Sequence, residues 1–228
     1  LVQQSIMRYI FASKFVRGRT VLDIACGSGF GTKLLKIAGA RKVIGVDISK
    51  KNIMFAKKYY ESAGVVFMVM DANNICFRSA AFDVIASFET IEHLETPEHF
   101  IKELKRVLTP KGILIISTPE KKYTSHPEYH RSELSYEEFF ALLERHFRYV
   151  DKYAQYLSLH ERLLKEVLPR SFRVLLLRVP YGSIIRSHLL SLSNKHPKGV
   201  LDPAKLDLCA IKNKFKRHEV RPFSVHFG

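Results

Sequence analysis

Apolar runs alternate with helical patterns over the first two thirds of the chain, and this alternation predicts an α/β fold. Short runs rich in apolar and β-branched residues predict buried strands at residues 20–24, 42–46, 65–70, 82–87 and 112–117. Between and after these runs, helices are predicted at residues 32–38, 50–62, 97–108 and 135–146. The expected helix starts are a Ser49 cap, a Thr96 cap followed by Pro97 and Glu98, and a capping box of Ser135 with Glu138. Strands that alternate with helices at this spacing are typical of βαβ units and of a parallel, doubly wound sheet.

The alternation changes after residue 146. Residues 147–157 and 206–212 each predict a further strand, which would bring the sheet to seven strands. We therefore expect a core over residues 1–157, a basic helical insertion or lid over 158–204, a last core strand over 205–212, and a basic tail over 213–228.

Positive charge is concentrated in the last third of the chain. The formal net charge is +15, and residues 151–228 carry 15 lysine and arginine residues against 6 acidic ones. Such a segment favours a polyanionic partner, which could be nucleic acid, an anionic membrane surface or a phosphate-bearing substrate. A basic surface that is only solvated, on a lid packed against the sheet, explains the same composition.

Cysteine use and apolar runs suggest where the protein works. Cys26, Cys76 and Cys209 lie far apart with no Cys-x-x-Cys spacing, which argues against a disulfide framework and favours a reducing, cytoplasmic setting. No signal peptide is expected at the start. The most apolar stretch, residues 174–179, contains Arg178, so no membrane-spanning segment is expected.

A glycine-rich turn follows the first predicted strand, in the run VLDIACGSGFGT at residues 21–32. Gly27, Gly29 and Gly31 would allow the backbone to approach a ligand closely. The amides at the start of the following helix would favour a carboxylate or a phosphate. This turn alone would also suit a dinucleotide-binding domain.

Three acidic residues lie at the carboxyl ends of successive predicted strands and refine this interpretation. Asp23 could meet an ammonium group, Asp47 could accept from two ribose hydroxyls, and Asp71 could accept from an adenine amino group. Open α/β sheets bind their ligands at these carboxyl ends. Because Asp23 would place negative charge beside a pyrophosphate, a zwitterionic amino acid is the better match.

The runs VLDIACGSG, VIGVDIS, MDA, FDVIASFETIEHL and LKRVLTPKGILIISTP together resemble class I S-adenosylmethionine-dependent methyltransferases of the ubiquinone-methyltransferase-like group, over about residues 9–150. The resemblance implies a Rossmann-like fold, S-adenosylmethionine as methyl donor and S-adenosylhomocysteine as product. The cofactor-binding residues that it implies are Asp23, Ala25, Gly27, Gly29, Asp47, Ile48, Asp71, Ala72 and Phe88. Ala25 stands where many members have glycine.

Further runs are similar to members found with glycan-assembly enzymes. They are RYIFASKFVRG, HPEYHRSELSYEEFFALLERHF and LDLCAIK, and the last implies an antiparallel final strand. This similarity favours O-methylation of a sugar, glycan or related hydroxylated acceptor, free or lipid-linked. Residues 158–204 could then contact a membrane surface or, in another interpretation, RNA. The oligomeric state stays open.

A second group of candidate residues follows the fourth predicted strand. If the run FETIEHL is helical, Glu89 faces Glu92 and His93. His93, Glu89 or His130 could then orient or deprotonate an acceptor hydroxyl, although His93 could also be purely structural. Small-RNA 2′-O-methyltransferases have a similar run, which implies a divalent metal on Glu89, Glu92, His93 and His130. A non-catalytic, cofactor-binding partner subunit is the remaining hypothesis.

Overall fold

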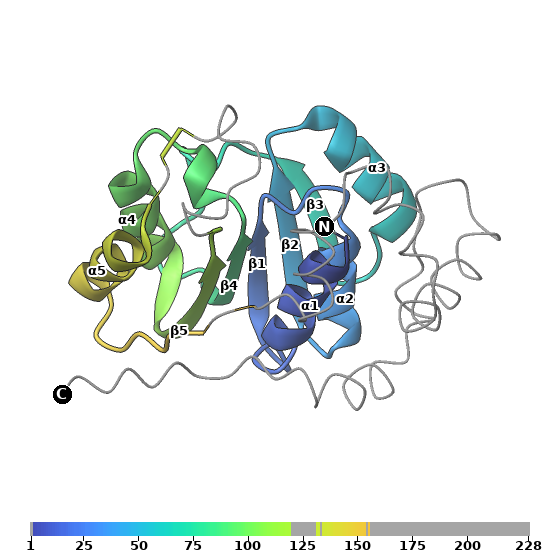
Figure 1. Cartoon of the computed structure of the whole chain (residues 1–228). Helices are drawn as coiled ribbons and strands as arrows, with labels where there is room; N and C mark the ends of the chain where they lie inside the picture. The colour runs from blue at the N-terminus through green and yellow to red at the C-terminus, as the bar shows by residue number, and fades with distance from the viewer. Residues whose placement is uncertain (1, 120–130, 133, 154, 156–228) are drawn as a thin grey trace, which may run out of the picture. The chain divides into compact units, whose positions relative to one another are not determined.

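A five-stranded parallel sheet forms the centre of the described fold (Figure 1). The computed structural model describes residues 2–119, 131–132, 134–153 and 155. In sheet order the strands are β3 (Val65–Val69), β2 (Lys42–Asp47), β1 (Thr20–Ile24), β4 (Phe82–Phe88) and β5 (Leu108–Ser117). The helices are α1 (Val2–Ala12), α2 (Phe30–Ile37), α3 (Lys50–Tyr60), α4 (Pro97–Val107) and α5 (Tyr136–His146). All of these elements belong to one compact unit, Leu1–Val150.

The strand order reverses at β1, and this reversal positions the site. The chain runs outward from β1 to β2 and β3, then returns to place β4 on the other side of β1. The carboxyl ends of β1 and β4 therefore leave a crevice between loops that run in opposite directions. Ligands of open α/β sheets bind at such a point.

The two faces of β1 carry different side chains. Leu22 and Ile24 are buried in the core cluster that includes residues of α4 and α5. Asp23 points to the other face, where Tyr9 of α1 and Thr32 of α2 donate hydrogen bonds to it. Figure 1 shows α1, α2 and α3 grouped around β1 to β3, and α4 and α5 beside β4 and β5. The period of two along the strand thus puts a carboxyl group among the α1 and α2 side chains.

Side-chain caps fix two of the helix starts as predicted. The Ser135 hydroxyl accepts from the Glu138 amide at 3.2 Å, and the Glu138 carboxylate accepts from the Ser135 amide at 2.8 Å. The Ser49 hydroxyl accepts from the Asn52 amide at 3.3 Å. Thr96, expected as a cap, makes no such bond, so the start of α4 rests on Pro97 and on the acidic Glu98 in the first turn.

Other predicted elements change. Residues 147–152 do not form the predicted strand, and Tyr149 is 80% exposed beneath the Arg148 guanidinium, so no neighbouring strand covers it. The strand β5 begins at Leu108 rather than at residue 112, because Leu108 pairs with Phe82 before a register shift. Residues 158–204, 205–212 and 213–228 lie outside the described residues. Among those described, no helix has both the length and the apolar character needed to cross a bilayer.

Candidate functional site

The glycine-rich turn between β1 and α2 is tied to the end of β2. The Cys26 amide donates to the Val46 carbonyl at 2.9 Å, and the Gly27 amide donates to Asp47 Oδ2 at 2.8 Å. Within the turn, the Gly29 amide donates to the Cys26 carbonyl at 3.1 Å. The turn is therefore held in one shape by its neighbouring strand.

The three glycines of this turn serve different purposes. A side chain at Gly27 would meet no atom within 4 Å, so this backbone faces open space, as ligand approach requires. A Cβ at Gly29 would lie 2.6 Å from Ala56 Cβ, and one at Gly31 would overlap the ring of Tyr9. We expected ligand approach to explain all three, but close helix packing explains Gly29 and Gly31.

Asp23 is enclosed by hydroxyl donors. Its side chain is fully buried, with Thr32 Oγ1 at 2.6 Å and Tyr9 Oη at 3.0 Å. Burial raises the pKa of Asp23 to about 7, and the two hydrogen bonds oppose that rise. A cation beside this carboxyl would favour its ionised form. Direct contact with an ammonium group stays a prediction, because Tyr9 and Thr32 surround the side chain.

Asp47 links the two strand ends. Its Oδ1 accepts from the Ser49 backbone amide at 2.9 Å and from the Asn52 side-chain amide at 3.3 Å. Its Oδ2 accepts from the Gly27 backbone amide. The next residue, Ile48, is 69% exposed. A fixed carboxylate beside an exposed branched apolar side chain suits a ligand that presents hydroxyls next to a flat apolar ring.

The third acid lies on an anchored loop. Asp71 follows β3 and is exposed, and its Oδ1 accepts from the Asn73 amide at 2.9 Å, so the second oxygen is available to a ligand. Farther along, the Arg106 guanidinium donates to the carbonyls of Phe77 at 2.7 Å and Ile75 at 2.9 Å. This loop is therefore fixed by α4. Ala72 beside Asp71 is partly buried.

Phe88 ends β4, Glu89 follows it, and both lie close to α1. The Phe88 ring meets the Tyr9 ring edge-on at 5.1 Å. The Glu89 carboxylate accepts from the Ser117 hydroxyl at 2.9 Å and lies 3.6 Å from the Arg8 guanidinium. Three elements thus meet at this carboxylate.

A helix through Glu89, the condition for its pairing with Glu92 and His93, is not formed. Glu89 has a φ of 53°, and its amide still donates to the Ser117 carbonyl at 3.0 Å, as a continuation of the sheet. Helical structure is limited to a short 3₁₀ turn, Ile91–His93. The expected pairing of Glu89 with Glu92 and His93 on one helical face is therefore not formed.

Glu92 is buried, and both its carboxylate and its backbone carbonyl accept hydrogen bonds. It is only 2% exposed, its carboxylate accepts from the Thr118 hydroxyl at 3.2 Å, and burial raises its pKa. Its carbonyl accepts from the amides of Arg131 and Ser132 at 2.9 and 3.1 Å. His93 is exposed, with Nε2 at 4.0 Å from the Glu92 carboxylate.

The metal alternative finds no support in the part of the chain that the structure describes. No group of three or more His, Cys, Asp or Glu side chains there is placed to hold a metal ion. His130, the fourth proposed ligand, lies outside the described residues, and so does its proposed catalytic role.

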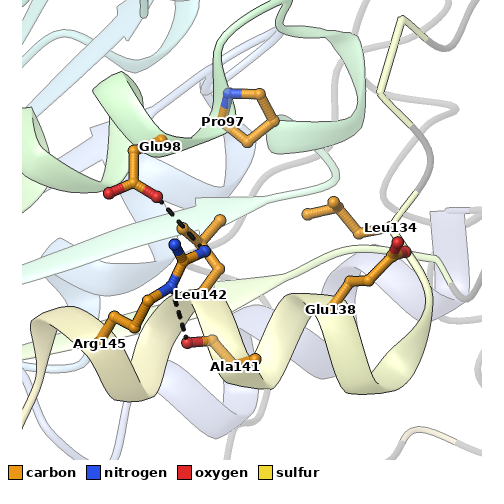
Figure 2. Close-up of a pocket in the computed structure, with 7 residues that line it drawn as sticks. All are labelled: Pro97, Glu98, Leu134, Glu138, Ala141, Leu142 and Arg145. Carbon is orange, nitrogen blue, oxygen red and sulfur yellow. Dashed lines mark hydrogen bonds and ion pairs between the residues drawn. The ribbon is translucent and has the colours of Figure 1, made fainter.

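A separate groove lies between the start of α4 and α5 (Figure 2). Its volume is about 390 Å³, and none of the predicted site residues lines it. Figure 2 shows Arg145 reaching across to Glu98, with the charged groups 3.4 Å apart. The groove is therefore distinct from the crevice at the end of β1.

The sequence profile described as "Methyltransferase domain" matches residues 22–116, which contain the glycine-rich turn, all three acids and the Glu89–His93 segment. The chain has a class I S-adenosylmethionine-dependent methyltransferase domain. Its solved relatives include an S-adenosylmethionine-dependent methyltransferase from Mesorhizobium loti, with a TM-score of 0.61 at 16% identity over 75% of this chain and 91% of that one. This likeness confirms the Rossmann-like fold of the methyltransferase domain.

Curated relatives are similar over the same region. A mitochondrial ubiquinone biosynthesis O-methyltransferase from Dictyostelium discoideum is 30% identical over 123 residues, which are 49% of this chain and 38% of the relative. A tRNA U34 carboxymethyltransferase from Hahella chejuensis is 35% identical over 106 residues, 45% of this chain and 33% of the relative. The chain thus spans between a third and two fifths of the length of these two relatives.

Sequence reasoning missed the partners of the acids. Tyr9, Thr32 and Arg8 were given no role, although Thr32 closes the glycine-rich run and the other two lie in a run noted for its resemblance. A hydroxyl residue nine positions after a buried strand-end acid is the signal that could have identified Thr32.

Proposed function

We propose that this protein transfers a methyl group from S-adenosylmethionine to a hydroxyl oxygen of a sugar, glycan or related small acceptor, free or lipid-linked. The observation that carries the donor half is the Asp47 carboxylate, which fixes the Gly27 amide at 2.8 Å and adjoins the exposed Ile48. The O-methyltransferase relative supports oxygen as the accepting atom.

The described residues fit this donor. Asp47 would accept from the ribose hydroxyls, Ile48 and Ala72 would flank the adenine, and Asp71 would accept from its amino group. The open backbone at Gly27 leaves room for the amino-acid part, near Asp23 and Phe88. When bound, S-adenosylmethionine supplies a methyl group carried on a sulfonium sulfur. An aligned nucleophile would take that methyl group, with S-adenosylhomocysteine leaving in line on the opposite side.

His93 is the proposed proton acceptor. Its exposed imidazole lies beside the buried Glu92 carboxylate, whose negative charge would stabilise the imidazolium formed when an acceptor hydroxyl loses its proton. Glu89 is held by Arg8 and Ser117, so we assign it to positioning the acceptor rather than to taking the proton.

The test uses purified protein, S-adenosylmethionine labelled in its methyl group, and a cell extract separated into lipid-and-glycan, RNA and small-molecule fractions. Label in the glycan fraction supports the proposal. His93→Ala should lower transfer about 100-fold or more while donor affinity stays unchanged. His99→Ala, at an exposed histidine of α4, is the matched control.

An RNA acceptor is the second candidate, favoured by the 35% identity with the tRNA-modifying relative. Label that enters RNA and disappears with a chelator would replace the first proposal with metal-dependent 2′-O-methylation. Donor binding without transfer to any fraction would instead indicate a non-catalytic subunit.

A further inference from the structure

Charge is distributed unevenly between the two edges of the described sheet, the β3 edge and the β5 edge. Residues 30–60, which include α2 and α3, contain eight lysine and arginine residues and one acid, Asp47. At the other end, α4 and α5 together carry five acids and four basic residues, and Glu98 and Glu103 lie in ion pairs. The basic character therefore belongs to the α2 and α3 end and not to the whole unit.

The outer face of α3 combines this charge with an exposed apolar side chain. Because a helix turns about 100° per residue, the four lysines and Met54 lie within about 120° of arc, with Met54 near the middle. Met54 is 63% exposed. These five exposed residues are Lys50, Lys51, Met54, Lys57 and Lys58.

The opposite face of α3 fixes this orientation. Ile53, Ala56 and Tyr60 are buried, at 3%, 0% and 3% exposure, where α3 packs on β2 and β3. The helix itself contains no acid to pair with its lysines. We call Lys50, Lys51, Met54, Lys57 and Lys58 the α3 surface.

The edge strand beside α3 is also apolar at its exposed end. Val69 is 53% exposed and Met68 is 39% exposed at the end of β3, the outermost strand of the described sheet. Figure 1 shows α3 alongside β3 at this end of the sheet. On α3 itself, the exposed Met54 among four lysines makes the α3 surface amphipathic.

We propose that the α3 surface docks on an anionic lipid membrane. Lysine ammonium groups would meet the headgroup phosphates while their methylene stems and the Met54 side chain would enter the boundary below. Nucleic acid would use the lysines but would leave Met54 without an apolar environment. A membrane uses both kinds of side chain, and this decides between the two polyanions.

The test is co-sedimentation of the full chain with vesicles of phosphatidylcholine alone and of phosphatidylcholine mixed with phosphatidylglycerol, at low and high salt. Binding to the anionic vesicles only, weakened by salt, is expected. Since one lysine near such a surface contributes about fivefold in affinity, Lys51→Gln combined with Lys58→Gln should lower the affinity about 25-fold. Met54→Gln should weaken it about fivefold.

The matched control is Lys102→Gln combined with Lys105→Gln, on the exposed side of α4, which should leave vesicle binding unchanged. Equal losses in both double variants would overturn the proposal, because binding would then follow net charge and not the α3 surface. No loss in either variant would also overturn it, because the basic residues after 150 would then account for binding. Failure to bind vesicles together with α3-dependent retention of single-stranded RNA would assign the surface to nucleic acid. Donor affinity, measured in the same variants, is independent of all these outcomes.

Discussion

At the scale of single residues, the buried carboxyl of Asp23 is the most consequential group of the site. Burial raises its pKa to about 7, even though Tyr9 and Thr32 donate hydrogen bonds to it. Because the folded pKa lies above the ordinary 3.8, the folded protein binds more protons than the unfolded chain from about pH 4 to pH 7. The contribution of Asp23 to stability therefore decreases as the pH rises through this window.

Asp23→Asn should remove this dependence while keeping an acceptor for both hydroxyls. Relative to the wild type, we expect the variant to gain about 2 to 4 kcal/mol of unfolding free energy between pH 4 and pH 8, measured by urea denaturation. Donor affinity should fall in the same variant. Asp71→Asn, at an exposed turn, is the control; a pH response there equal to that of Asp23→Asn would refute this account.

Two glycines only four positions apart should respond differently to alanine. Gly31→Ala meets the Tyr9 ring and should cost about 2 to 3 kcal/mol of unfolding free energy. Gly27→Ala would meet no atom but would place alanine at a φ of 55°, which should cost about 1 kcal/mol of unfolding free energy. It should nevertheless weaken donor binding more than Gly31→Ala does. Denaturation and calorimetric titration would measure the two effects, and equal stability losses would contradict the packing role of Gly31.

The acids and their partners differ in how well sequence could predict them. Asp23, Asp47 and Asp71 lie at the carboxyl ends of predicted strands, so a parallel sheet alone brings them to one edge. The contact between Tyr9 and Asp23 depends on the angle at which α1 crosses the sheet. No periodicity in the sequence determines that angle.

At the scale of elements, α5 shows how a local signal fixes a boundary. The Ser135 and Glu138 capping box was predicted and is formed, and Phe139, Phe140 and Leu143 of the helix it starts are buried. Glu89 shows the opposite case. A helical segment would have paired it with Glu92 and His93, but a hydrogen bond from its amide to the Ser117 carbonyl, 28 residues away, extends the sheet instead.

Ser135→Ala should therefore destabilise the fold without affecting the donor site. Loss of the cap leaves helix amides unpaired and should cost about 1 kcal/mol, visible as a lower urea midpoint. Ser135→Asp, which keeps an acceptor at the cap, should restore most of that loss. A variant with an unchanged midpoint would show that α5 is held by its apolar face alone.

At the scale of the whole molecule, the sheet of the described unit could be predicted from the sequence, whereas the candidate site also includes residues on loops. The order of five parallel strands follows from alternating patterns and right-handed crossovers. The proposed acceptor side was less predictable, since it would depend on Glu89, Glu92 and Thr118, whose contacts join separate elements.

Donor binding should stabilise the whole unit through Asp47. S-adenosylmethionine at about 100 times its dissociation constant should add about 2.7 kcal/mol and raise the unfolding temperature by about 5 to 10 °C. Asp47→Ala releases the Gly27 and Ser49 amides and should abolish most of that rise. Glu61→Ala, at an exposed position after α3, is the control that should keep it.

The anchoring of the loop between β3 and β4 by Arg106 has a kinetic consequence. Since its carbonyls at Ile75 and Phe77 are already held, the adenine side needs no slow closure before the donor enters. Association should follow a single exponential whose rate rises linearly with donor concentration, at about 10⁶ M⁻¹s⁻¹. Arg106→Gln would free the loop, and a second, concentration-independent phase should then appear in stopped-flow traces.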